Sequence, residues 1–312
     1  MSDFNCIPIS YVDNALLLPL MLEEERAWLA DLEWDYSGIR EILLSFARQK
    51  LLPGYVAFKD GNAVGYTYFL VNQAKGIIGS LYASASGRSQ ETVDQLVRLA
   101  ATSLKEKEKV NRIEAQIMPF HSQDLTSPFM RNGFTFHERS YLRLDLKSFA
   151  AAPGRLRAGK IIPWSSLYLD SAAEMNMLSY RGQSDAQICE DYRTLAGCES
   201  YLRSLVENPG CGVLMQEASF MALDAQGRTI GLILCSRISE GAAMIPQIAV
   251  HPLHQGLGVG NTLMDNTLSR LRKLGFHSVA LTVTKGNTRA YSWYQRVGFR
   301  HLKDFGAYVW ER

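Results

Sequence analysis

The sequence predicts an α/β protein made of two domains that share one order of strands and helices. Three observations lead to this prediction. The length of 312 residues is comfortable for two ordinary domains. Strand-like and helix-like segments alternate in both halves of the chain. The stretch "FMRNGFTF" of the first half also aligns with "YQRVGFRH" of the second at four positions, which indicates an internal duplication.

The composition is typical of a globular protein and requires neither a nucleic-acid nor a membrane partner. Hydrophobic residues make up 47% and charged residues 21%, and the net charge is +2. The first 150 residues carry 16 Lys and Arg against 18 Asp and Glu, and the remainder carries 17 against 13. The mildly basic second half suits a small anionic ligand better than a duplex. We expect no membrane span, because no apolar run reaches about 20 residues.

The N-terminus and the cysteines indicate a cytoplasmic protein. "MSDFNCIPIS" has no basic segment followed by an apolar one, so we expect no export signal. The five cysteines are an odd number and form no C-x-x-C pair. This pattern favours free thiols in a reducing compartment and no metal site. The oligomeric state is left open between a monomer and a homodimer.

The boundary between the predicted domains falls in residues 147–160, "KSFAAAPGRLRAGK". This segment is rich in Ala, Gly and basic residues, and it breaks the periodicity on both sides. We therefore assign residues 1–150 to the first domain and residues 151–312 to the second.

Strand and helix patterns alternate after this boundary. A hairpin is predicted in "ASFMALDAQGRTIGLILCSRIS", with its turn at Asp224–Gly227. Further strands are predicted at 242–250 and 277–283. Helices are predicted at 166–181, 198–207, 259–274 and 287–298. Asn287 is the expected N-cap of the last helix and Gly298 its stop.

The first half repeats this order. A hairpin turns at Asp60–Asn62, and the strands "KGIIGSLYAS" and "NRIEAQIMPF" flank a charged amphipathic helix over 90–109. A short helix and a strand follow in "SPFMRNGFTFHERSYLRLDL". The segment between the first of these strands and the helix, "SASGRSQETVDQ", contains a single glycine, Gly87.

The corresponding segment of the second half, "HQGLGVGNTLMD" (254–265), contains three glycines directly before a predicted helix. Free N–H groups at a helix start attract anions, and glycines let phosphate oxygens approach the backbone. A tight turn with nothing bound is the alternative. A P-loop would require Gly-Lys-Ser/Thr, but Asn261-Thr262 follow Gly260, and the dinucleotide fingerprint lacks its third glycine.

Residues 249–299 resemble the core of the GNAT superfamily of N-acetyltransferases. The Q/R-x-x-G-x-G/A signature is matched by Gln255, Gly258 and Gly260. The preceding V-x-P is matched by Val250-His251-Pro252. The downstream N-x-x-A-x-x-x-Y-x-x-x-G-F is matched by Asn287, Ala290, Tyr294, Gly298 and Phe299. The resemblance implies two GNAT-like domains, each with a mostly antiparallel sheet flanked by helices, and a splayed strand pair in the C-terminal domain. The N-terminal copy is degenerate, since it lacks the loop glycines.

The resemblance also implies roles for individual residues, with acetyl-CoA as the co-substrate. The backbone that holds the coenzyme A pyrophosphate would be Gln255, Gly256, Leu257, Gly258, Val259 and Gly260, with Asn261 opening the helix and Asn287 completing the coenzyme-binding set. The backbone of Ile248, Ala249 and Val250 would polarise the acetyl carbonyl. Tyr294 would protonate the leaving thiolate, because a phenol with a pKa of about 10 carries its proton at neutral pH.

Pro246 gives an independent indication of the splayed pair. A proline lacks the N–H that a central strand requires, so a bulge at this position would resolve the conflict. The alternative is that Pro246 starts the strand or lies at an edge.

The general base is not identified. Family members often place Glu or His at the positions of Met244 and Pro246, and neither residue here accepts a proton. Gln247 could orient a water, and His251 and His254 lie nearby in the sequence but more naturally structure the loop. Glu217 and Tyr168 are further candidates. Arg289, Lys285 and Arg296 around the last helix could contact phosphates or form a solvated basic face.

The sequence therefore favours an acetyl-CoA-dependent N-acetyltransferase in which a primary amine attacks the thioester directly, in a ternary complex. The acceptor is a small-molecule or peptide amine that the sequence does not name. The missing base supports an alternative, a non-catalytic acyl-CoA-binding or interaction module. A protein that uses the loop for another nucleotide phosphate is a third reading.

Overall fold

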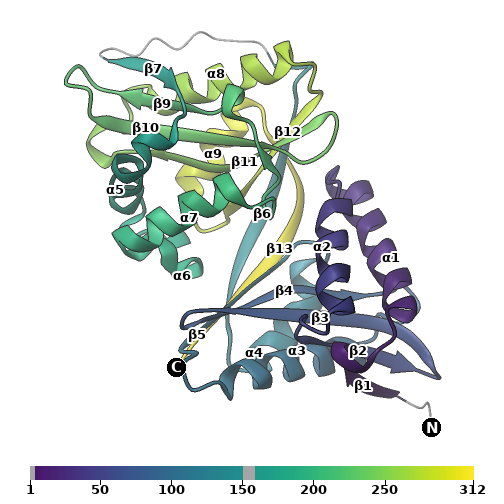
Figure 1. Cartoon of the computed structure of the whole chain (residues 1–312). Coiled ribbons are helices and arrows are strands. Elements are labelled where there is room, and N and C mark those ends of the chain that lie inside the picture. Colours follow the sequence, from purple (N-terminus) through teal and green to yellow (C-terminus); the bar gives the residue numbers. More distant parts are fainter. Residues whose placement is uncertain (1–3, 150–158) are drawn as a thin grey trace. The chain divides into compact units, whose positions relative to one another are not determined.

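A computed structural model describes residues 4–149 and 159–312, and it divides the chain into two compact units (Figure 1). Unit 1 contains the residues up to Arg139 together with Lys303–Arg312, and unit 2 is Ser140–Leu302. Most of the predicted boundary segment lies in residues 150–158, outside the described residues. The contact-based units differ from the predicted division, since the end of the chain belongs to unit 1.

Unit 1 is a sheet with two helices on each face. Its strands are β1 (Phe4–Pro8), β2 (Gly54–Lys59), β3 (Asn62–Asn72), β4 (Lys75–Ala83), β5 (Arg112–Ile117) and β13 (Arg300–Glu311). Its helices are α1 (Asn14–Leu32), α2 (Ser37–Arg48), α3 (Gln90–Lys105) and α4 (Ser122–Arg131). The strands lie in the order β1-β2-β3-β4-β5-β13, and only β4 and β5 are parallel. Side chains of α1 and α2 pack on one face, and those of α3 and α4 on the other.

Unit 2 repeats this plan. Its strands are β6 (Thr135–Asp145), β7 (Lys160–Pro163), β8 (Val213–Leu214), β9 (Phe220–Leu223), β10 (Thr229–Arg237), β11 (Ala242–Val250) and β12 (Ser278–Thr284). Its helices are α5 (Leu169–Tyr180), α6 (Asp185–Ile188), α7 (Leu195–Glu207), α8 (Val259–Lys273) and α9 (Thr288–Val297). The main strand order is β7-β9-β10-β11-β12-β6; the neighbouring strands from β7 to β11 pair antiparallel, and β11 and β12 pair parallel. The mixed, mostly antiparallel sheet confirms the predicted fold class.

The last strand of each repeat belongs to the other repeat's unit. β6 ends the first half of the sequence, but its residues from Ser140 onward are part of unit 2, where β6 neighbours β12. β13 ends the second half, yet it pairs with β5 of unit 1, with Gly306 opposite Ile117. A boundary drawn at residue 150 cannot describe this exchange, because the strand that completes each sheet is distant in sequence from the others.

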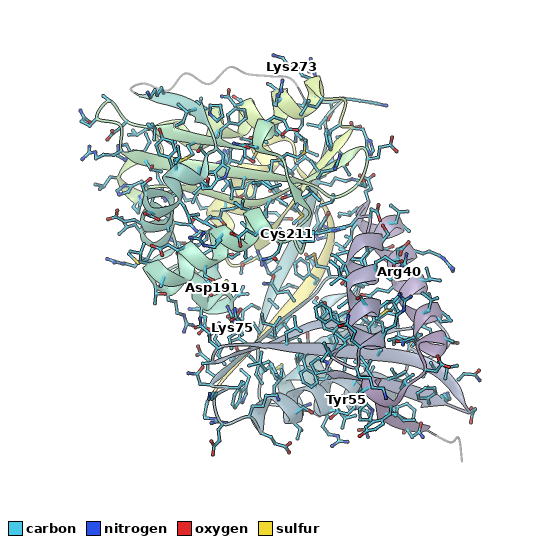
Figure 2. All side chains as sticks on the ribbon, in the orientation of Figure 1. Arg40, Tyr55, Lys75, Asp191, Cys211 and Lys273 are labelled. Carbon is cyan, nitrogen blue, oxygen red and sulfur yellow. The ribbon has the colours of Figure 1, made fainter. Side chains whose placement is uncertain are left out.

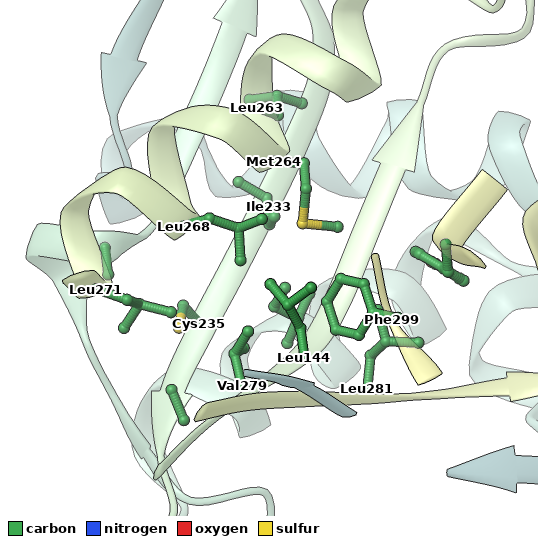
Figure 3. Packing of buried hydrophobic residues seen from close by; sticks show 14 of the residues in the cluster. Leu144, Ile233, Cys235, Leu263, Met264, Leu268, Leu271, Val279, Leu281 and Phe299 are labelled. Atoms are coloured by element: carbon green, nitrogen blue, oxygen red, sulfur yellow. The ribbon is translucent and has the colours of Figure 1, made fainter. Parts of the chain in front are cut away.

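The core of unit 2 beneath α8 follows from the spacing of apolar residues along the helix. Leu263 and Met264 are adjacent, and Leu268 and Leu271 follow at intervals of four and three residues, so these side chains share one face of α8. Figure 3 shows this face against strand residues that include Ile233, Val279 and Leu281. The opposite face of the sheet is covered by α5 and α7. α8 and α9 thus lie on one side of β11, with α5 and α7 on the other (Figure 1).

No helix within residues 4–149 and 159–312 combines the length and the apolar character needed to cross a membrane.

Candidate functional site

The parallel strands β11 and β12 pair only at their beginnings. Ala242 lies opposite Ser278, and the pairing ends where Met244 lies opposite Ala280. β11 nevertheless continues to Val250, and β12 continues to Thr284. We call the segment beyond the last pair the split, with 245–250 on one edge and 281–284 on the other. The structure therefore contains the splayed strand pair that the sequence predicted.

A bulge in β11 marks the beginning of the split. Leu234 of β10 lies opposite Gln247, and Ser236 lies opposite Met244, so two residues of β11 oppose the single residue Cys235. The two residues that oppose Cys235 are Ile245 and Pro246. A proline that cannot donate to the ladder is therefore placed where the ladder is interrupted. Of the two readings for Pro246, the structure shows the bulge.

Strand alternation decides which backbone groups past the bulge face away from β10. The N–H of His251 donates to the carbonyl of Ile230 in β10. The carbonyl of Val250 instead accepts a hydrogen bond from the hydroxyl of Ser179 on α5, and the carbonyl of Pro246 accepts one from the hydroxyl of Tyr201 on α7. Because backbone groups alternate along a strand, the N–H of Ile248 also points away from β10. Of the three predicted backbone positions 248–250, Ala249 therefore faces β10, and Ile248 and Val250 face the split.

The glycine loop, residues 254–261, joins β11 to α8 and leaves a run of N–H groups open. Gly256 and Gly258 have φ of +77° and +88°, a region that side chains disfavour. A Cβ at either position would meet no atom within 4 Å, so this surface of the loop is open. The N–H groups of Gly256 to Asn261 have no acceptor among the described residues. They lie at the positive end of the 15-residue helix α8.

Two side chains of the loop are held by other parts of unit 2. Gln255 donates from Nε2 to the Val250 carbonyl at 3.1 Å, and its Oε1 accepts from Arg289 at 3.0 Å. Asn261 accepts at Oδ1 from the indole Nε1 of Trp293 at 2.6 Å. These bonds tie the two polar side chains to β11 and α9. The side chains of Gln255 and Asn261 are therefore held away from the open N–H groups of the loop.

Helix α9 begins and ends as its sequence predicts. Asn287 caps it by accepting from the N–H of Ala290 at 3.2 Å, and Gly298 follows the last turn with φ of +115°. Tyr294 is buried, and its ring meets Phe299 edge-on and Trp293 at a tilt. Tyr294 thus extends from α9 into the core below α8 rather than into solvent.

A hollow of about 290 Å³ lies on another flank of α9. It is lined by Lys285, Thr288, Tyr291 and Ser292. Arg289 and Trp293, one turn apart on the helix, instead contact the glycine loop. The hollow and the loop are therefore separate surfaces of unit 2.

His251, near the loop, has a structural role. The Nδ1 of His251 accepts from the N–H of Leu253 at 3.2 Å and so caps the 3-10 turn Pro252–His254. Burial, with smaller effects from His254 and Arg228, lowers the pKa of His251. Its ring is thus neutral at physiological pH and ordered by the loop. The structure places Glu217 in a separate 3-10 turn, where it is exposed.

Asp185 is a polar residue of this region that the sequence did not single out. Its Oδ1 accepts from the hydroxyl of Thr284 at 2.8 Å, and its Oδ2 accepts from Asn287 Nδ2 at 3.4 Å. Thr284 ends β12 and Asn287 caps α9, so a carboxylate of α6 lies at the open end of the split. The only local signal is the Ser184-Asp185 pair at a helix start, which is far too common to identify a site.

Gln247 is the second residue whose importance the sequence understated. It is 1% exposed and faces the α5 side of β11. Its Nε2 donates to Asn176 Oδ1 at 2.6 Å and to the Tyr180 hydroxyl at 3.2 Å, and its Oε1 accepts from Tyr192 at 3.0 Å. With all these bonds made inside the protein, the amide is a structural element rather than a free side chain that orients a solvent water.

Unit 1 contains a similar split, but N–H groups of the loop that follows it are bonded to side chains. Its parallel pairing ends where Ile78 lies opposite Ala115, and β4 continues to Ala83 past an extra residue at Gly79. In the following loop, the N–H of Ala85 donates to the carboxylate of Glu23, and the N–H of Gly87 donates to Ser84 Oγ. These two N–H groups thus already donate to side chains of unit 1, and one of those side chains is the carboxylate of Glu23.

These features of unit 2 agree with comparisons to known proteins. Residues 187–299 match the model of the acetyltransferase (GNAT) family. This part of the chain is therefore similar to the GNAT family. The GNAT segment contains the bulge, the split, the glycine loop, α8 and α9.

Two curated acetyltransferases share short segments with this chain. Mycothiol acetyltransferase of Geodermatophilus obscurus is 41% identical over 66 residues, which is 21% of each protein. N-alpha-acetyltransferase 30 of Schizosaccharomyces pombe is 29% identical over 96 residues, which cover 30% of this chain and 63% of that protein. The matched segments span less than two thirds of either relative.

Solved GNAT structures match the chain along nearly its whole length. A GCN5-related N-acetyltransferase of Sphaerobacter thermophilus has a TM-score of 0.71 at 15% identity, over 99% of this chain and 95% of that one. A tandem GNAT protein from the clavulanic acid biosynthesis pathway has a TM-score of 0.65 at 13% identity, over 99% and 98%. At these identities the likeness shows the GNAT fold, which is the fold the sequence predicted.

Proposed function

We propose that the chain is an acetyl-CoA-dependent N-acetyltransferase that moves an acetyl group to a primary amine by direct attack in a ternary complex. The observation that carries this proposal is the glycine loop of unit 2, whose N–H groups from Gly256 to Asn261 have no acceptor among the described residues. The loop joins the strand that opens the split to the start of α8. A pyrophosphate bound there would leave the acyl arm to run along the split.

The residues of unit 2 suit the steps of acyl transfer. The N–H of Ile248, past the bulge, is directed away from β10 and polarises the acetyl carbonyl as the amine nitrogen attacks its carbon. Tyr294 donates its proton to the thiolate as the carbon–sulfur bond breaks, so Tyr294 is the candidate catalytic acid. The attacking amine gives one of its two protons to solvent, and solvent returns a proton to Tyr294 before the next turnover.

The acceptor is an amine that does not depend on a strong base. Met244 and Pro246 occupy the strand positions where family members carry Glu or His, and neither accepts a proton. An amine with a pKa close to neutral is partly uncharged at pH 7, whereas a lysine-like amine of pKa about 10.4 is not. We therefore favour a small molecule or peptide with a weakly basic primary amine. The two curated relatives are a mycothiol acetyltransferase and an N-alpha-acetyltransferase.

We further propose that unit 1 does not bind coenzyme A. Its loop N–H groups at Ala85 and Gly87 are already bonded to side chains. The carboxylate of Glu23 beside this loop would repel a phosphate. Unit 1 is then a degenerate copy that keeps the fold of the domain and leaves the chemistry to unit 2.

A non-catalytic acyl-CoA-binding module is the second candidate, favoured by the missing base at Met244 and Pro246. One assay separates the two. The enzyme releases thiol from acetyl-CoA only when an amine from a panel is present, whereas the binding module is stabilised thermally by acetyl-CoA but releases none.

The variant Tyr294→Phe tests the catalytic assignment. We expect its turnover to fall by about 100-fold, because the leaving thiolate loses its acid, while its affinity for acetyl-CoA stays close to that of the wild type. Tyr291→Phe on the same helix is the matched control and retains activity. Normal turnover by Tyr294→Phe would remove Tyr294 from the mechanism.

A further inference from the structure

One helical segment of unit 2 is hydrogen-bonded to both edges of the split. We call residues 176–201, from the end of α5 into α7, the bridging segment; Figure 2 labels Asp191 within it. On the β11 edge, Asn176, Tyr180 and Tyr192 hold the buried Gln247. The rings of Tyr180 and Tyr192 are stacked with their centroids 3.9 Å apart. This stacking fixes the two hydroxyl groups relative to each other.

The second attachment is on the β12 edge. Asp185 accepts from Thr284, the last residue of β12, and from Asn287, the cap of α9. Thr284 is 4% exposed, so its hydroxyl has little access to a competing water. A buried hydroxyl that donates to a carboxylate makes one of the stronger kinds of hydrogen bond.

Both attachments are on the same face of the sheet. Leu281 and Val283 of β12 pack in the core below α8, so alternation places Thr284 on the opposite face. Ile245 and Ile248 of β11 also pack toward α8, and Gln247 bonds to α5 on the other side. The bridging segment therefore joins the two strands beyond the point where their own pairing has ended.

We propose that Gln247 and Asp185 are positioning residues that together fix the separation of β11 and β12 along the split. This role rests on the proposed acyl transfer. No backbone ladder connects the strands beyond Met244 and Ala280, so the ladder cannot set their distance. The bridging segment can, because it bonds to Gln247 on one edge and to Thr284 on the other. A displacement of about 1 Å in such an arrangement can cost about 100-fold in rate.

The Gln247 attachment has a counterpart in unit 1, which indicates that it is part of the repeated plan. Ser80, the first residue after the β4 bulge, donates to Glu24 of α1 at 2.7 Å. Trp28, four residues after Glu24, donates to the same carboxyl and stacks on Tyr36 at 4.9 Å. In unit 2, Tyr180 likewise follows Asn176 by four residues and stacks on Tyr192.

The other edge of the unit 1 split is also connected to a helix. Lys303 donates to the carbonyl of Pro119, just after β5, at 3.2 Å, and its Nζ lies 3.7 Å from Asp31 of α1. Each unit thus connects a helix of one face to both of its diverging strands. The residue types differ between the units, so the connection itself is the shared feature.

The experiment uses hydrogen exchange and turnover of the full chain with Asp185→Ala, Asp185→Asn and Gln247→Leu. In the wild type, acetyl-CoA should protect the amides of two segments, 245–250 and 256–262. Asp185→Ala should keep the protection at 256–262 but lose it at 245–250. Its turnover should fall about tenfold or more, with the affinity for acetyl-CoA nearly unchanged.

Asp185→Asn should give an intermediate result, because its amide oxygen still accepts from Thr284 while its NH₂ group cannot accept from Asn287. The exposed Asp170→Asn on α5 is the control and should behave as the wild type. If Gln247→Leu does not fold, the Asp185 variants alone decide the question.

The outcomes separate this inference from the proposed function. Wild-type protection of 256–262, together with unchanged protection of 245–250 and unchanged turnover in Asp185→Ala, would overturn the positioning role alone. Absence of protection at 256–262 in the wild type would overturn the proposed function, and with it this role.

Discussion

The indole Nε1 of Trp293 donates to the Oδ1 of Asn261 at 2.6 Å, and this bond joins α9 to the first turn of α8. One turn earlier on α9, Arg289 donates to Gln255 at the other end of the glycine loop. The two contacts hold the loop from one helix flank. The shape of the loop therefore depends on α9 as well as on its own glycines.

Trp293→Phe should weaken the binding of coenzyme A without unfolding unit 2. Phenylalanine keeps most of the apolar contact but leaves Asn261 without its donor, and a neutral hydrogen bond of this kind is worth about 1 kcal/mol. We expect the affinity for coenzyme A to fall about fivefold, measured by isothermal titration calorimetry. Ser292→Ala, the adjacent residue, lines the separate hollow and is the control. Equal affinities of the two variants would show that the contact does not shape the loop.

Arg289→Gln should lower the affinity for coenzyme A in a way that depends on salt. The guanidinium lies 3.0 Å from Gln255 and so adds positive charge beside the loop. Screening shortens the range of this charge to about 10 Å at 0.1 M salt and about 3 Å at 1 M. The loss of affinity should therefore be severalfold at low salt and should shrink as salt is added.

Arg296→Gln is the matched control for this charge. Arg296 is on the same helix, but seven residues further on, or about 10 Å along the axis. If both variants lose affinity equally, the effect comes from the general charge of unit 2 and not from contact with the loop.

Glu24→Gln should change how the stability of unit 1 depends on pH. Glu24 is fully buried, and burial raises the pKa of its carboxyl, although hydrogen bonds from Tyr66, Ser80 and Trp28 oppose the shift. A raised pKa means that the folded state favours the protonated acid. The stability from protonation is complete below the unfolded-state pKa of about 4, and it is lost as pH rises through the higher folded-state pKa.

The free energy of unfolding of the wild type should therefore fall relative to Glu24→Gln as the pH rises above the unfolded-state pKa of about 4. Burial also raises the pKa of Tyr36 and of Tyr66 well above the ordinary value, so these neighbours stay protonated over this range. Urea unfolding followed by tryptophan fluorescence measures the difference, because Trp28 contacts the carboxyl. Glu25→Gln, whose carboxylate pairs with Arg40, is the control. Parallel curves for the wild type and Glu24→Gln would contradict the prediction.

Helices with strong local signals could be predicted from the sequence alone. The predicted helix 259–274 is observed as Val259–Lys273, and the predicted N-cap Asn287 precedes the helix Thr288–Val297. α1 and α2 were not predicted. In α1, Pro19 lies inside the helix, and Leu16 and Leu29 are exposed, so the apolar residues do not form one clear stripe.

The exchange of the last strands could not be predicted, because it depends on which sheet edge a strand meets. β6 and β13 are long strands at equivalent places in the repeat, and their own residues do not specify the partner. Contact across the fold also explains why Asp185 was missed. Its partner Thr284 is 99 residues away, and only the folded sheet brings the two together. The glycine loop, in contrast, is local in sequence and was found there.

Gly258→Ala and Gly275→Ala form a matched pair that tests whether the loop binds phosphate. The two glycines flank α8 and have nearly the same positive φ, +88° and +86°. A Cβ on either would meet no atom within 4 Å, so neither variant creates a clash. Each alanine should cost about 1 kcal/mol in the free energy of unfolding, because its left-handed backbone is strained. Urea unfolding measures this shared cost.

Only Gly258→Ala should also affect the ligand. Its Cβ would enter the space beside the open N–H groups, where a phosphate oxygen would approach the backbone. We expect its affinity for coenzyme A to fall about tenfold or more, while Gly275→Ala binds as the wild type does. Calorimetry of both variants compares their affinities for coenzyme A, while their free energies of unfolding stay matched. Unaltered binding by Gly258→Ala would place the coenzyme away from this loop, because strain alone is the same in the two proteins.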